Sequence, residues 1–389
     1  SFNANRHLLS MASVVILGSA HPLRGGLSSY NERLAREFLL MGHEVTIYTF
    51  SLQYPSLLFP GKTQLSASPK PPDLDIRVCV NSINPLNWIQ VGRTIARQKP
   101  DVLITKYWLP FMAGCLGTIC RMVKKNNHTK IICILDNLIP HEKRPGDKQL
   151  THFFMNGLDA CIAQSNSVLQ DVDLFSKTIP RRLCPHPIFD NFGEPVSRDQ
   201  ALHYLGLDHN YRYMLFFGFI REYKGLDILL QAFAQIHKKH PQLKLIVAGE
   251  FYVDRKSYLN LIESLQLTEV IELRTDYIRD EDVRYYFCAS DLVVQPYKHA
   301  TQSGVTQICY HFNKPMLVTH VGGLADIVPD GIVGYVTPVS ADAVANAISD
   351  FYDHNRMETF SFNVQSEKLK YSWRNMVNHI FDLCEEIVP

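Results

Sequence analysis

Residues 213–225 read YMLFFGFIREYKG and combine several signals in one short passage. An apolar run typical of a buried strand ends at Phe217, a glycine follows, and Arg221 and Lys224 stand three residues apart before a helical pattern begins at Leu226. The end of a parallel strand followed by a helix amino terminus favours a bound anion, because the helix dipole and free N–H groups add to the two side-chain charges. The passage therefore predicts a phosphate site. The alternative reading of this passage is a solvated Arg/Lys loop.

The composition is that of a globular protein with room for more than one core. The chain has 389 residues, of which 46% are hydrophobic and 20% charged. This length suffices for two domains of ordinary size. A formal net charge of +1 gives no reason to expect a nucleic-acid partner.

The cysteines and the apolar runs indicate in which cellular compartment the protein is expected. The nine cysteines are scattered and never form C-x-x-C, which favours reduced thiols in a cytosolic compartment and disfavours a zinc site. No apolar run reaches the roughly 20 residues that cross a bilayer. Residues 1–10 lack the apolar segment of a signal peptide, and we interpret them as a tag or a disordered extension.

Strand and helix patterns alternate along the chain. An apolar run at 14–17, a glycine-bearing loop, a helical pattern and a second strand at 43–48 predict a βαβ unit. The other expected strands are at 102–105, 131–135, 160–163, 213–217, 243–248, 270–273, 292–295, 316–319 and 334–336. The alternation lapses at 184–207, which we interpret as an interdomain linker, and the chain ends in an amphipathic helix at 374–387.

This alternation predicts an α/β protein with two Rossmann-like domains that face each other across a cleft. The expected divisions are the extension at 1–10, an N-terminal acceptor domain at 11–195, a C-terminal donor domain at 196–365 and a C-terminal helix at 366–389 that packs back on the first domain. The chain has no G-x-G-x-x-G motif, which disfavours a dinucleotide oxidoreductase.

Several motifs, in their order and spacing, resemble those of the retaining glycosyltransferases of family 4, which have the two-domain GT-B fold. Residues 31–48 are similar to the amino-terminal unit of the family, 218–227 to its donor-phosphate loop, and 245–250, 289–296 and 315–324 to its later strands and turns. The resemblance covers nearly everything after residue 11. It implies a nucleoside-diphosphate sugar as donor, an acceptor held by the N-terminal domain, and transfer with retention of configuration. It implies no catalytic metal and no separate cofactor, and we find no persuasive metal motif.

The resemblance assigns the main catalytic role to Arg221 and Lys224, which neutralise the donor diphosphate as the glycosidic bond breaks. The loop starts at Gly218, which we include in the donor site, and its arginine stands two residues later than in many relatives. Gly25 and Gly26 follow the first strand, where a backbone without side chains can approach a phosphate or sugar. The alternative for these two glycines is a tight turn.

Polar residues after the expected strand at 131–135 are further candidates. Many relatives have a histidine where Asp136 stands; an aspartate accepts a hydrogen bond from a sugar hydroxyl but, when ionised, has no proton to donate. We include His141 as a catalytic candidate and Glu142 as an acceptor contact. A structural role for His141 is the alternative.

The loop at 299–308 departs from the family pattern. Relatives usually have two glutamates here, separated by seven residues, and alignment on Pro315 puts Ala300 and Ile308 at those positions. A rewired donor site would use hydroxyls, amides and backbone N–H groups, and a degenerate site is the alternative. The donor-binding candidates in this loop are Gln302, Ser303, Gly304, Thr306 and Gln307.

Two aromatic regions complete the candidate site. Arg274, Tyr277 and Ile278 fall where relatives bind the nucleobase, with ordinary core packing as the alternative. Trp108 and the aromatic segment at 54–60 form an apolar region of the acceptor domain, which is either core or a contact for a lipid carrier or the membrane interface.

The leading hypothesis is a metal-independent hexosyltransferase that acts on a glycan or glycolipid hydroxyl in surface polysaccharide biosynthesis. We expect it in the cytoplasm, with peripheral contact at the inner face of the cell membrane if the aromatic region binds lipid. A nucleotide-sugar 2-epimerase is the first alternative, and a non-catalytic nucleotide-sugar-binding scaffold is the second.

Overall fold

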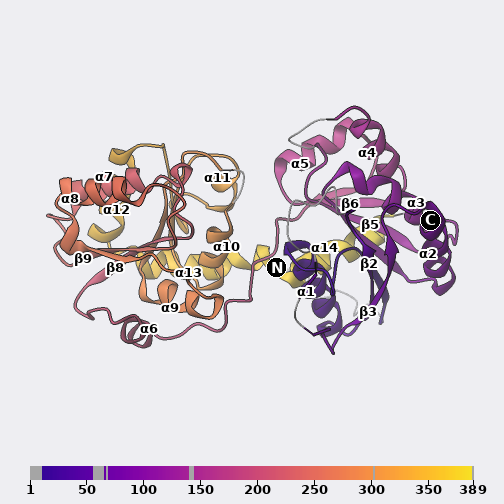
Figure 1. Cartoon of the computed structure of the whole chain (residues 1–389), viewed down its shortest axis with the longest axis horizontal. Helices are drawn as coiled ribbons and strands as arrows, with labels where there is room; N and C mark the ends of the chain where they lie inside the picture. The colour runs from indigo at the N-terminus through magenta and orange to yellow at the C-terminus, as the bar shows by residue number, and fades with distance from the viewer. Residues whose placement is uncertain (1–10, 56–64, 67–68, 140–143, 301–302, 388–389) are drawn as a thin grey trace, which may run out of the picture. The chain divides into compact units, whose positions relative to one another are not determined.

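The computed structural model describes residues 11–55, 65–66, 69–139, 144–300 and 303–387. The chain forms two compact units (Figure 1). Unit 1 consists of Ser1–Pro187 and Tyr371–Pro389, and unit 2 of Ile188–Lys370.

Unit 1 is built on a parallel sheet with the strand order β3-β2-β1-β4-β5-β6-β7. Its strands are β1 (Ser13–Leu17), β2 (Glu44–Leu52), β3 (Asp75–Asn81), β4 (Val102–Tyr107), β5 (Lys130–Leu135), β6 (Ala160–Ala163) and β7 (Arg181–Leu183). The chain moves outward from β1 to β3 and then returns to β4 on the other side. The strand order therefore reverses between β1 and β4, which is where open α/β sheets bind ligands.

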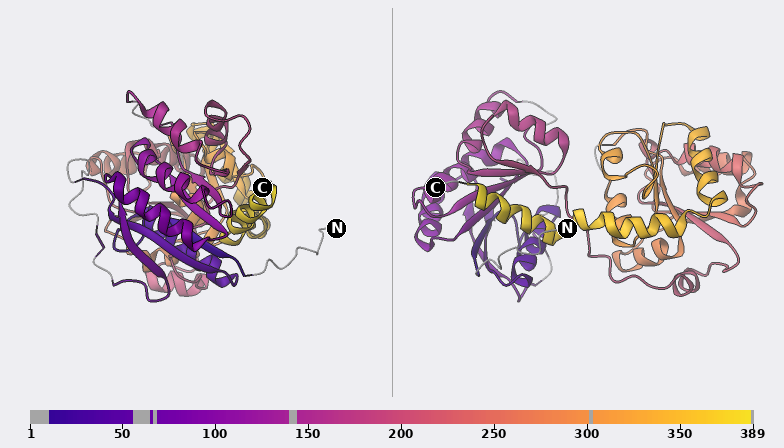
Figure 2. Two further views of the ribbon diagram at one scale, coloured as in Figure 1. Left: turned by 90° about the vertical axis from the view of Figure 1, so that its right-hand side faces the viewer. Right: turned by 180° about the vertical axis from the view of Figure 1, so that it is seen from behind.

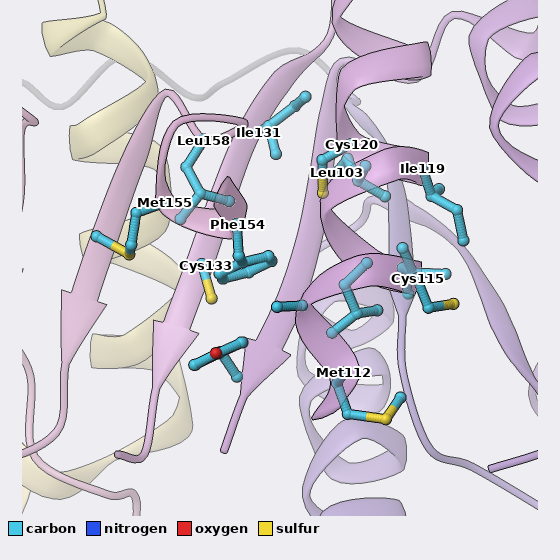
Figure 3. Packing of buried hydrophobic residues seen from close by; sticks show 14 of the residues in the cluster. Leu103, Met112, Cys115, Ile119, Cys120, Ile131, Cys133, Phe154, Met155 and Leu158 are labelled. Carbon is cyan, nitrogen blue, oxygen red and sulfur yellow. The ribbon is translucent and has the colours of Figure 1, made fainter. Parts of the chain in front are cut away.

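Helices cover both faces of this sheet. They are α1 (Gly26–Leu40), α2 (Pro85–Gln98), α3 (Ala113–Lys124), α4 (Asp147–Met155), α5 (Asn166–Asp171) and α14 (Trp373–Glu386). Alternate residues of the central strands β1, β4, β5 and β6 enter opposite cores, as the period of two in a strand requires. Figure 3 shows one core, in which Cys115 and Ile119 of α3 and Phe154 of α4 meet Leu103 of β4 and Cys133 of β5.

The other core contains α1 and the C-terminal helix α14. Phe381 of α14 lies edge-on to Phe38 of α1, with ring centroids 5.7 Å apart, and Met376 and Ile380 are fully buried. The two further views show α14, in yellow, along the sheet of unit 1 (Figure 2). The predicted return of the C-terminal helix to the N-terminal domain is therefore confirmed.

Unit 2 has a second parallel sheet, in the order β10-β9-β8-β11-β12-β13. Its strands are β8 (Arg212–Phe217), β9 (Leu243–Ala248), β10 (Ile271–Arg274), β11 (Leu292–Gln295), β12 (Met316–Thr319) and β13 (Gly334–Thr337). The strand order reverses between β8 and β11. The phosphate loop predicted from the sequence follows β8, so it lies at this reversal.

The helices of unit 2 are α6 (Arg198–Leu205), α7 (Leu226–Ile236), α8 (Arg255–Ser264), α9 (Val283–Ala289), α10 (Gly304–His311), α11 (Leu324–Ile327), α12 (Ala341–Asp353) and α13 (Met357–Glu367). Apolar residues of α7, α8 and α12 form a core with β8, β9 and β11. Because Leu229, Leu230 and Phe233 recur at helical spacing, α7 buries one continuous face.

The predicted class, an α/β protein with two Rossmann-like domains, is confirmed. The predicted linker at 184–207 was wrong in part, because it contains α6. Ser197 and Gln200 form a capping box at the start of this helix, and Gly206 ends it in the left-handed conformation. The strands β3 and β7 and the helix α13 were not predicted. None of the helices in the described residues has an apolar stretch long enough to span a membrane.

Candidate active site

The loop after β8 carries the predicted cations and folds by means of two glycines. Gly218 has φ +100°, and Gly225, the N-cap of α7, has φ +70°. Both values lie in the region that glycine adopts without steric cost. Between them, the backbone N–H of Lys224 donates to the carbonyl of Arg221 at 3.0 Å in a short 3₁₀ turn.

The loop presses against the end of β11. A Cβ atom on Gly225 would lie 1.9 Å from the carbonyl oxygen of Pro296, so only glycine fits there. The N–H of Lys298 also donates to the carbonyl of Tyr223 at 2.7 Å. The segments that follow β8 and β11 thus contact each other at the carboxyl ends of these two strands, where the strand order of unit 2 reverses.

Lys224 is half-buried between the loop after β8 and the start of α10. A Cβ atom on Gly218 would stand 2.9 Å from its Nζ and 3.9 Å from Cγ2 of Val305 on α10. The Nζ is also 5.8 Å from the ring centroid of Tyr297. Burial, and secondarily the charge of Arg221, lower the pKa of Lys224 to about 8. Within the described residues no carboxylate pairs with this lysine, so its charge is available to a ligand.

Arg221 differs from Lys224 in exposure. Its side chain is exposed, and its guanidinium carbon lies 5.1 Å from the ring centroid of Tyr252. A guanidinium over an aromatic face keeps its N–H donors at the ring edge free for other acceptors. The loop therefore offers one half-buried and one exposed cation.

The amino terminus of α10 lies at the same carboxyl ends of β8 and β11. Ser303 is its N-cap: its hydroxyl donates to Oε1 of Gln295 at 2.7 Å and accepts the N–H of Val305 at 3.2 Å. The hydroxyl of Thr306 is fully buried and donates to the carbonyl of Ser303 at 2.6 Å. Because both hydroxyls serve the fold, the groups of this turn that face solvent are the backbone atoms of Gly304, which is exposed.

Gln307 adds a buried amide to this helix. Its Oε1 is buried and has no hydrogen-bond partner in the described parts of the chain. Ile308, at the second glutamate position of the family, is buried, and Ala300, at the first, is half-buried. Gln302 lies outside the described residues.

The candidate nucleobase residues follow the neighbouring strand ends. The carbonyl of Arg274 accepts the N–H of Gly249 at 2.9 Å, and a Cβ atom on Gly249 would lie 2.2 Å from the carbonyl oxygen of Gly218. The Arg274 guanidinium donates to the carbonyl of Leu205 at 3.2 Å. The ends of β8, β9 and β10 thus lie side by side.

The two other residues predicted at this position differ in exposure. Tyr277 is 68% exposed, and Ile278 is half-buried. An exposed aromatic ring is free to stack on a flat ligand.

In unit 1, the two predicted glycines lie at the start of α1. Gly25 is its N-cap with φ +112°, and a Cβ atom on Gly25 or Gly26 would meet nothing within 4 Å. The turn is therefore open. Trp108, after β4, is half-buried: its Nε1 donates to the hydroxyl of Tyr54 at 2.7 Å and it packs against the core beside Phe111.

Asp136 follows β5, and its backbone N–H donates to the carbonyl of Tyr107 at 2.9 Å. Its carboxylate pairs with Lys106 of β4, a residue that the sequence analysis did not single out. The signal was present, because a lysine inside the apolar strand VLITKY breaks the pattern of a buried strand. His141 and Glu142 lie outside the described residues.

The described side chains also bear on a metal site. Among the described residues, no three His, Cys, Asp or Glu side chains are grouped so that they could hold a metal ion. The nine cysteines, all within the described ranges, are unpaired.

Comparison with known proteins places this arrangement in a class. A profile of the family described as "Glycosyl transferases group 1" matches residues 211–354, and one described as "Glycosyltransferase Family 4" matches residues 24–183. The first match spans the predicted phosphate loop in unit 2, and the second spans most of the sheet of unit 1. The chain belongs to the group 1, family 4 glycosyltransferases.

Curated relatives and solved structures agree with this assignment. D-inositol 3-phosphate glycosyltransferase 1 of Catenulispora acidiphila is 25% identical over 96% of this chain and 94% of its own length. Lipopolysaccharide 1,2-N-acetylglucosaminetransferase of Salmonella typhimurium is 28% identical over 46% of this chain, and the match spans about half of that relative (49%). The Anabaena protein HepE, solved in complex with UDP, has a TM-score of 0.66 and 16% identity, with 96% of this chain and 100% of that chain covered. At this identity the structural likeness shows the fold.

Proposed function

We propose that the protein is a retaining hexosyltransferase that moves a hexose from a nucleoside-diphosphate sugar to a hydroxyl of a glycan or lipid-linked acceptor. The observation that carries the proposal is the position of Lys224. Its ammonium lies beside Gly218 at the strand-order reversal of unit 2 without a carboxylate partner in the described residues, in the same loop as Arg221. A half-buried cation of this kind is suited to a diphosphate.

The role of the two cations follows from charge. When the bond between the sugar and the diphosphate breaks, negative charge builds on the leaving phosphate oxygen. Groups that are already in place to stabilise developing charge commonly make the largest contribution to a rate. In this proposal Lys224 and Arg221 supply that stabilisation, and the N–H groups at the start of α10 add to it.

The proposed classes of donor and acceptor are inferred from the names of similar proteins. HepE is described in complex with UDP, and the Salmonella typhimurium relative acts on lipopolysaccharide by its name. We infer that this chain uses a nucleotide sugar as substrate, needs no metal, and acts in the cytoplasm on a surface glycan. In the mechanism proposed here, the leaving phosphate takes the proton of the incoming hydroxyl on the same face of the sugar.

The remaining site residues receive roles in this proposal. Asp136 accepts a hydrogen bond from a sugar hydroxyl, and the open turn at Gly25 and Gly26 admits the donor. Tyr277 stacks on the base, and Trp108 contacts the acceptor. Half-burial of Trp108 against the core leaves one part of the indole for a lipid carrier or a sugar ring.

The test is Lys224→Ala, with Lys239→Ala as the matched control. Lys239 lies in the same unit, 66% of its side chain is exposed, and it pairs with Asp353 at 2.8 Å. Loss of one group that stabilises developing charge lowers a rate by roughly a hundredfold to a thousandfold. We therefore expect Lys224→Ala to lose transfer by this factor and Lys239→Ala to keep it. Equal turnover in both variants would remove the proposal.

A non-catalytic scaffold is the second candidate, and one observation favours it. The two usual glutamate positions hold Ala300 and the buried Ile308, so neither supplies a carboxylate. The assay separates the three possibilities when it follows both nucleoside diphosphate and sugar. A transferase releases diphosphate and forms a glycoside with the anomeric configuration of the donor, visible by NMR. A 2-epimerase changes the donor without acceptor, and a scaffold binds UDP-, GDP- or ADP-sugars without turnover.

A further inference from the structure

A cluster of polar side chains lies at the carboxyl end of the unit 1 sheet. Lys106 is on β4, Asp136 follows β5 and Gln164 follows β6. Alternation along each strand places them on one face, because the even-numbered residues that precede them, such as Ile104, Ile134 and Ile162, belong to the core that α1 and α14 cover. These three strands are neighbours in the sheet. The cluster is therefore a consequence of the topology.

The ammonium of Lys106 has two hydrogen-bond partners and one aromatic neighbour. It donates to Oδ1 of Asp136 and to Oε1 of Gln164, the latter at 3.0 Å, and it lies 3.9 Å from the ring centroid of Tyr30. An ammonium has three N–H donors, of which these hydrogen bonds use two, and the Tyr30 ring lies against the charge. Lys106 is only 3% exposed, and burial lowers its pKa while the Asp136 carboxylate opposes that effect. The side chain of this lysine is therefore too buried to present its charge to a phosphate in solvent.

Gln164 is held in one orientation by the same cluster. Its Oε1 accepts from Lys106, and its Nε2 donates to the hydroxyl of Tyr30 at 3.1 Å. Tyr30 is in the first turns of α1 and is 3% exposed. A rigid helix and a rigid sheet therefore both restrain the position of the lysine.

Asp136 has a carboxylate oxygen that no other described residue contacts by a hydrogen bond. Its Oδ1 is taken by Lys106, whereas Oδ2 has no partner among the described residues. Of its side chain, 24% is exposed, compared with 4% for Lys106. The cluster thus presents one carboxylate oxygen outward and buries its counter-charge behind it.

We propose that Lys106 is a positioning residue that fixes the Asp136 carboxylate so that Oδ2 accepts a hydrogen bond from a hydroxyl of the sugar. The inference rests on the proposed function and adds a residue to it. Lys106 contacts no substrate and acts through Asp136. A second phosphate site at Lys106 is the competing explanation, and the burial of Lys106 together with its two hydrogen bonds argues against it.

The substitutions that test the proposal are Lys106→Met, Asp136→Asn and the double variant. Loss of a charge-assisted hydrogen bond corresponds to roughly a tenfold to hundredfold change in rate. We expect Lys106→Met to lower kcat by this factor while KM for the donor stays within about twofold, because the diphosphate is held by unit 2. The matched control is Lys124→Met, which removes a lysine of the same unit that pairs with Asp159 at 2.6 Å, with 46% of the lysine side chain exposed. It should leave kcat unchanged.

The double variant keeps the test valid if the lone Lys106→Met substitution unfolds unit 1. Removal of one partner of a buried ion pair leaves an uncompensated charge, whereas removal of both charges does not. If Lys106 acts through Asp136, the double variant has the kcat of Asp136→Asn alone. A further tenfold loss in the double variant, or full kcat in Lys106→Met, would overturn the proposal.

Binding of UDP, measured by calorimetry, separates failure of this inference from failure of the proposed function. Wild-type protein that transfers sugar while Lys106→Met transfers equally well contradicts only the role of Lys106. Wild-type protein that turns over none of the tested sugar nucleotides contradicts the proposed function itself. Weaker UDP binding in Lys106→Met, with KM raised and kcat unchanged, assigns the lysine to a phosphate site and also contradicts the positioning role.

Discussion

The Cα of Gly218 and the Nζ of Lys224 are so close that a Cβ atom on the glycine would stand 2.9 Å from the ammonium. Six positions apart in the chain, these residues meet because the loop after β8 turns back on itself before α7. Gly218 also needs its φ of +100° to start that turn. The glycine thus serves both the backbone path and the space for the cation.

Gly218→Ala should therefore displace Lys224 as well as strain the backbone. We expect at least about a tenfold loss of affinity for nucleoside diphosphate, the effect of about 1.4 kcal/mol. The matched control is Gly331→Ala, because Gly331 has φ +70° in the same unit and nothing lies within 4 Å of an added Cβ atom. Calorimetric titration should show weaker binding in the first variant only. Equal affinities in both would contradict the link between Gly218 and Lys224.

The lowered pKa of Lys224 predicts a pH dependence of diphosphate binding. In the free protein the amine loses its proton as pH rises through about 8. The protonated form binds the anion, so affinity should be full near pH 7 and fall at pH 9. The terminal phosphate ionises near pH 6 and does not titrate in this range. Lys224→Arg, whose guanidinium keeps its charge, should bind with a flat profile. An equally flat profile in the wild type would contradict a titrating Lys224.

Phe381 of α14 should contribute strongly to the stability of unit 1. The ring is 6% exposed and packs against Phe38 and His43. Phe381→Ala should lower the free energy of unfolding by about 3–5 kcal/mol, the usual cost of a buried phenyl cavity. Phe362 on α13 is 68% exposed and provides the control, for which we expect a change below about 0.5 kcal/mol. Hydrogen exchange should show the faster opening in β1, β2 and α1, and unchanged exchange there would contradict the assignment of α14 to this core.

His186 should make unit 1 less stable in mild acid. Burial, and then the charge of Lys106, lower its pKa to about 4, whereas an unfolded histidine has a pKa of about 6.5. Between these values the unfolded chain binds a proton that the folded chain does not, so stability falls as pH falls. The effect between pH 7 and pH 5 is about 2 kcal/mol.

His186→Phe keeps an aromatic ring beside Tyr30, whose ring centroid is 5.0 Å from that of His186. Denaturant unfolding at both pH values should show a smaller loss of stability in the variant than in the wild type. The corresponding control is His354→Phe, because His354 is exposed, with 61% of its side chain accessible. The same acid sensitivity in the wild type and in His186→Phe would contradict a neutral, half-buried His186.

Local patterns were enough to predict much of this fold. The apolar run before Gly218 and the helical spacing after Lys224 predicted β8 and α7, because burial periodicity follows directly from side-chain geometry within an element. The same reasoning missed β3 and β7. The sequence of β3 is DIRVCVN, in which charged residues stand at the first and third positions and three of the seven residues are exposed, and β7 has only three residues. Neither therefore has the continuous apolar run that marks a central strand.

Local sequence patterns could not predict which side chains from distant parts of the chain contact each other. The lysine in VLITKY and the aspartate after β5 are 30 positions apart, and Gln164 is 58 positions from Lys106. Their contact depends on which strands are neighbours, and that follows from long-range burial of the whole sheet. The docking of α14 on α1 has the same origin. The amino-acid order thus determined most elements, their buried faces and the predicted phosphate loop. Only the tertiary structure brought Lys106 to Asp136 and the last helix to the first unit, because such contacts follow from sheet topology and not from local periodicity.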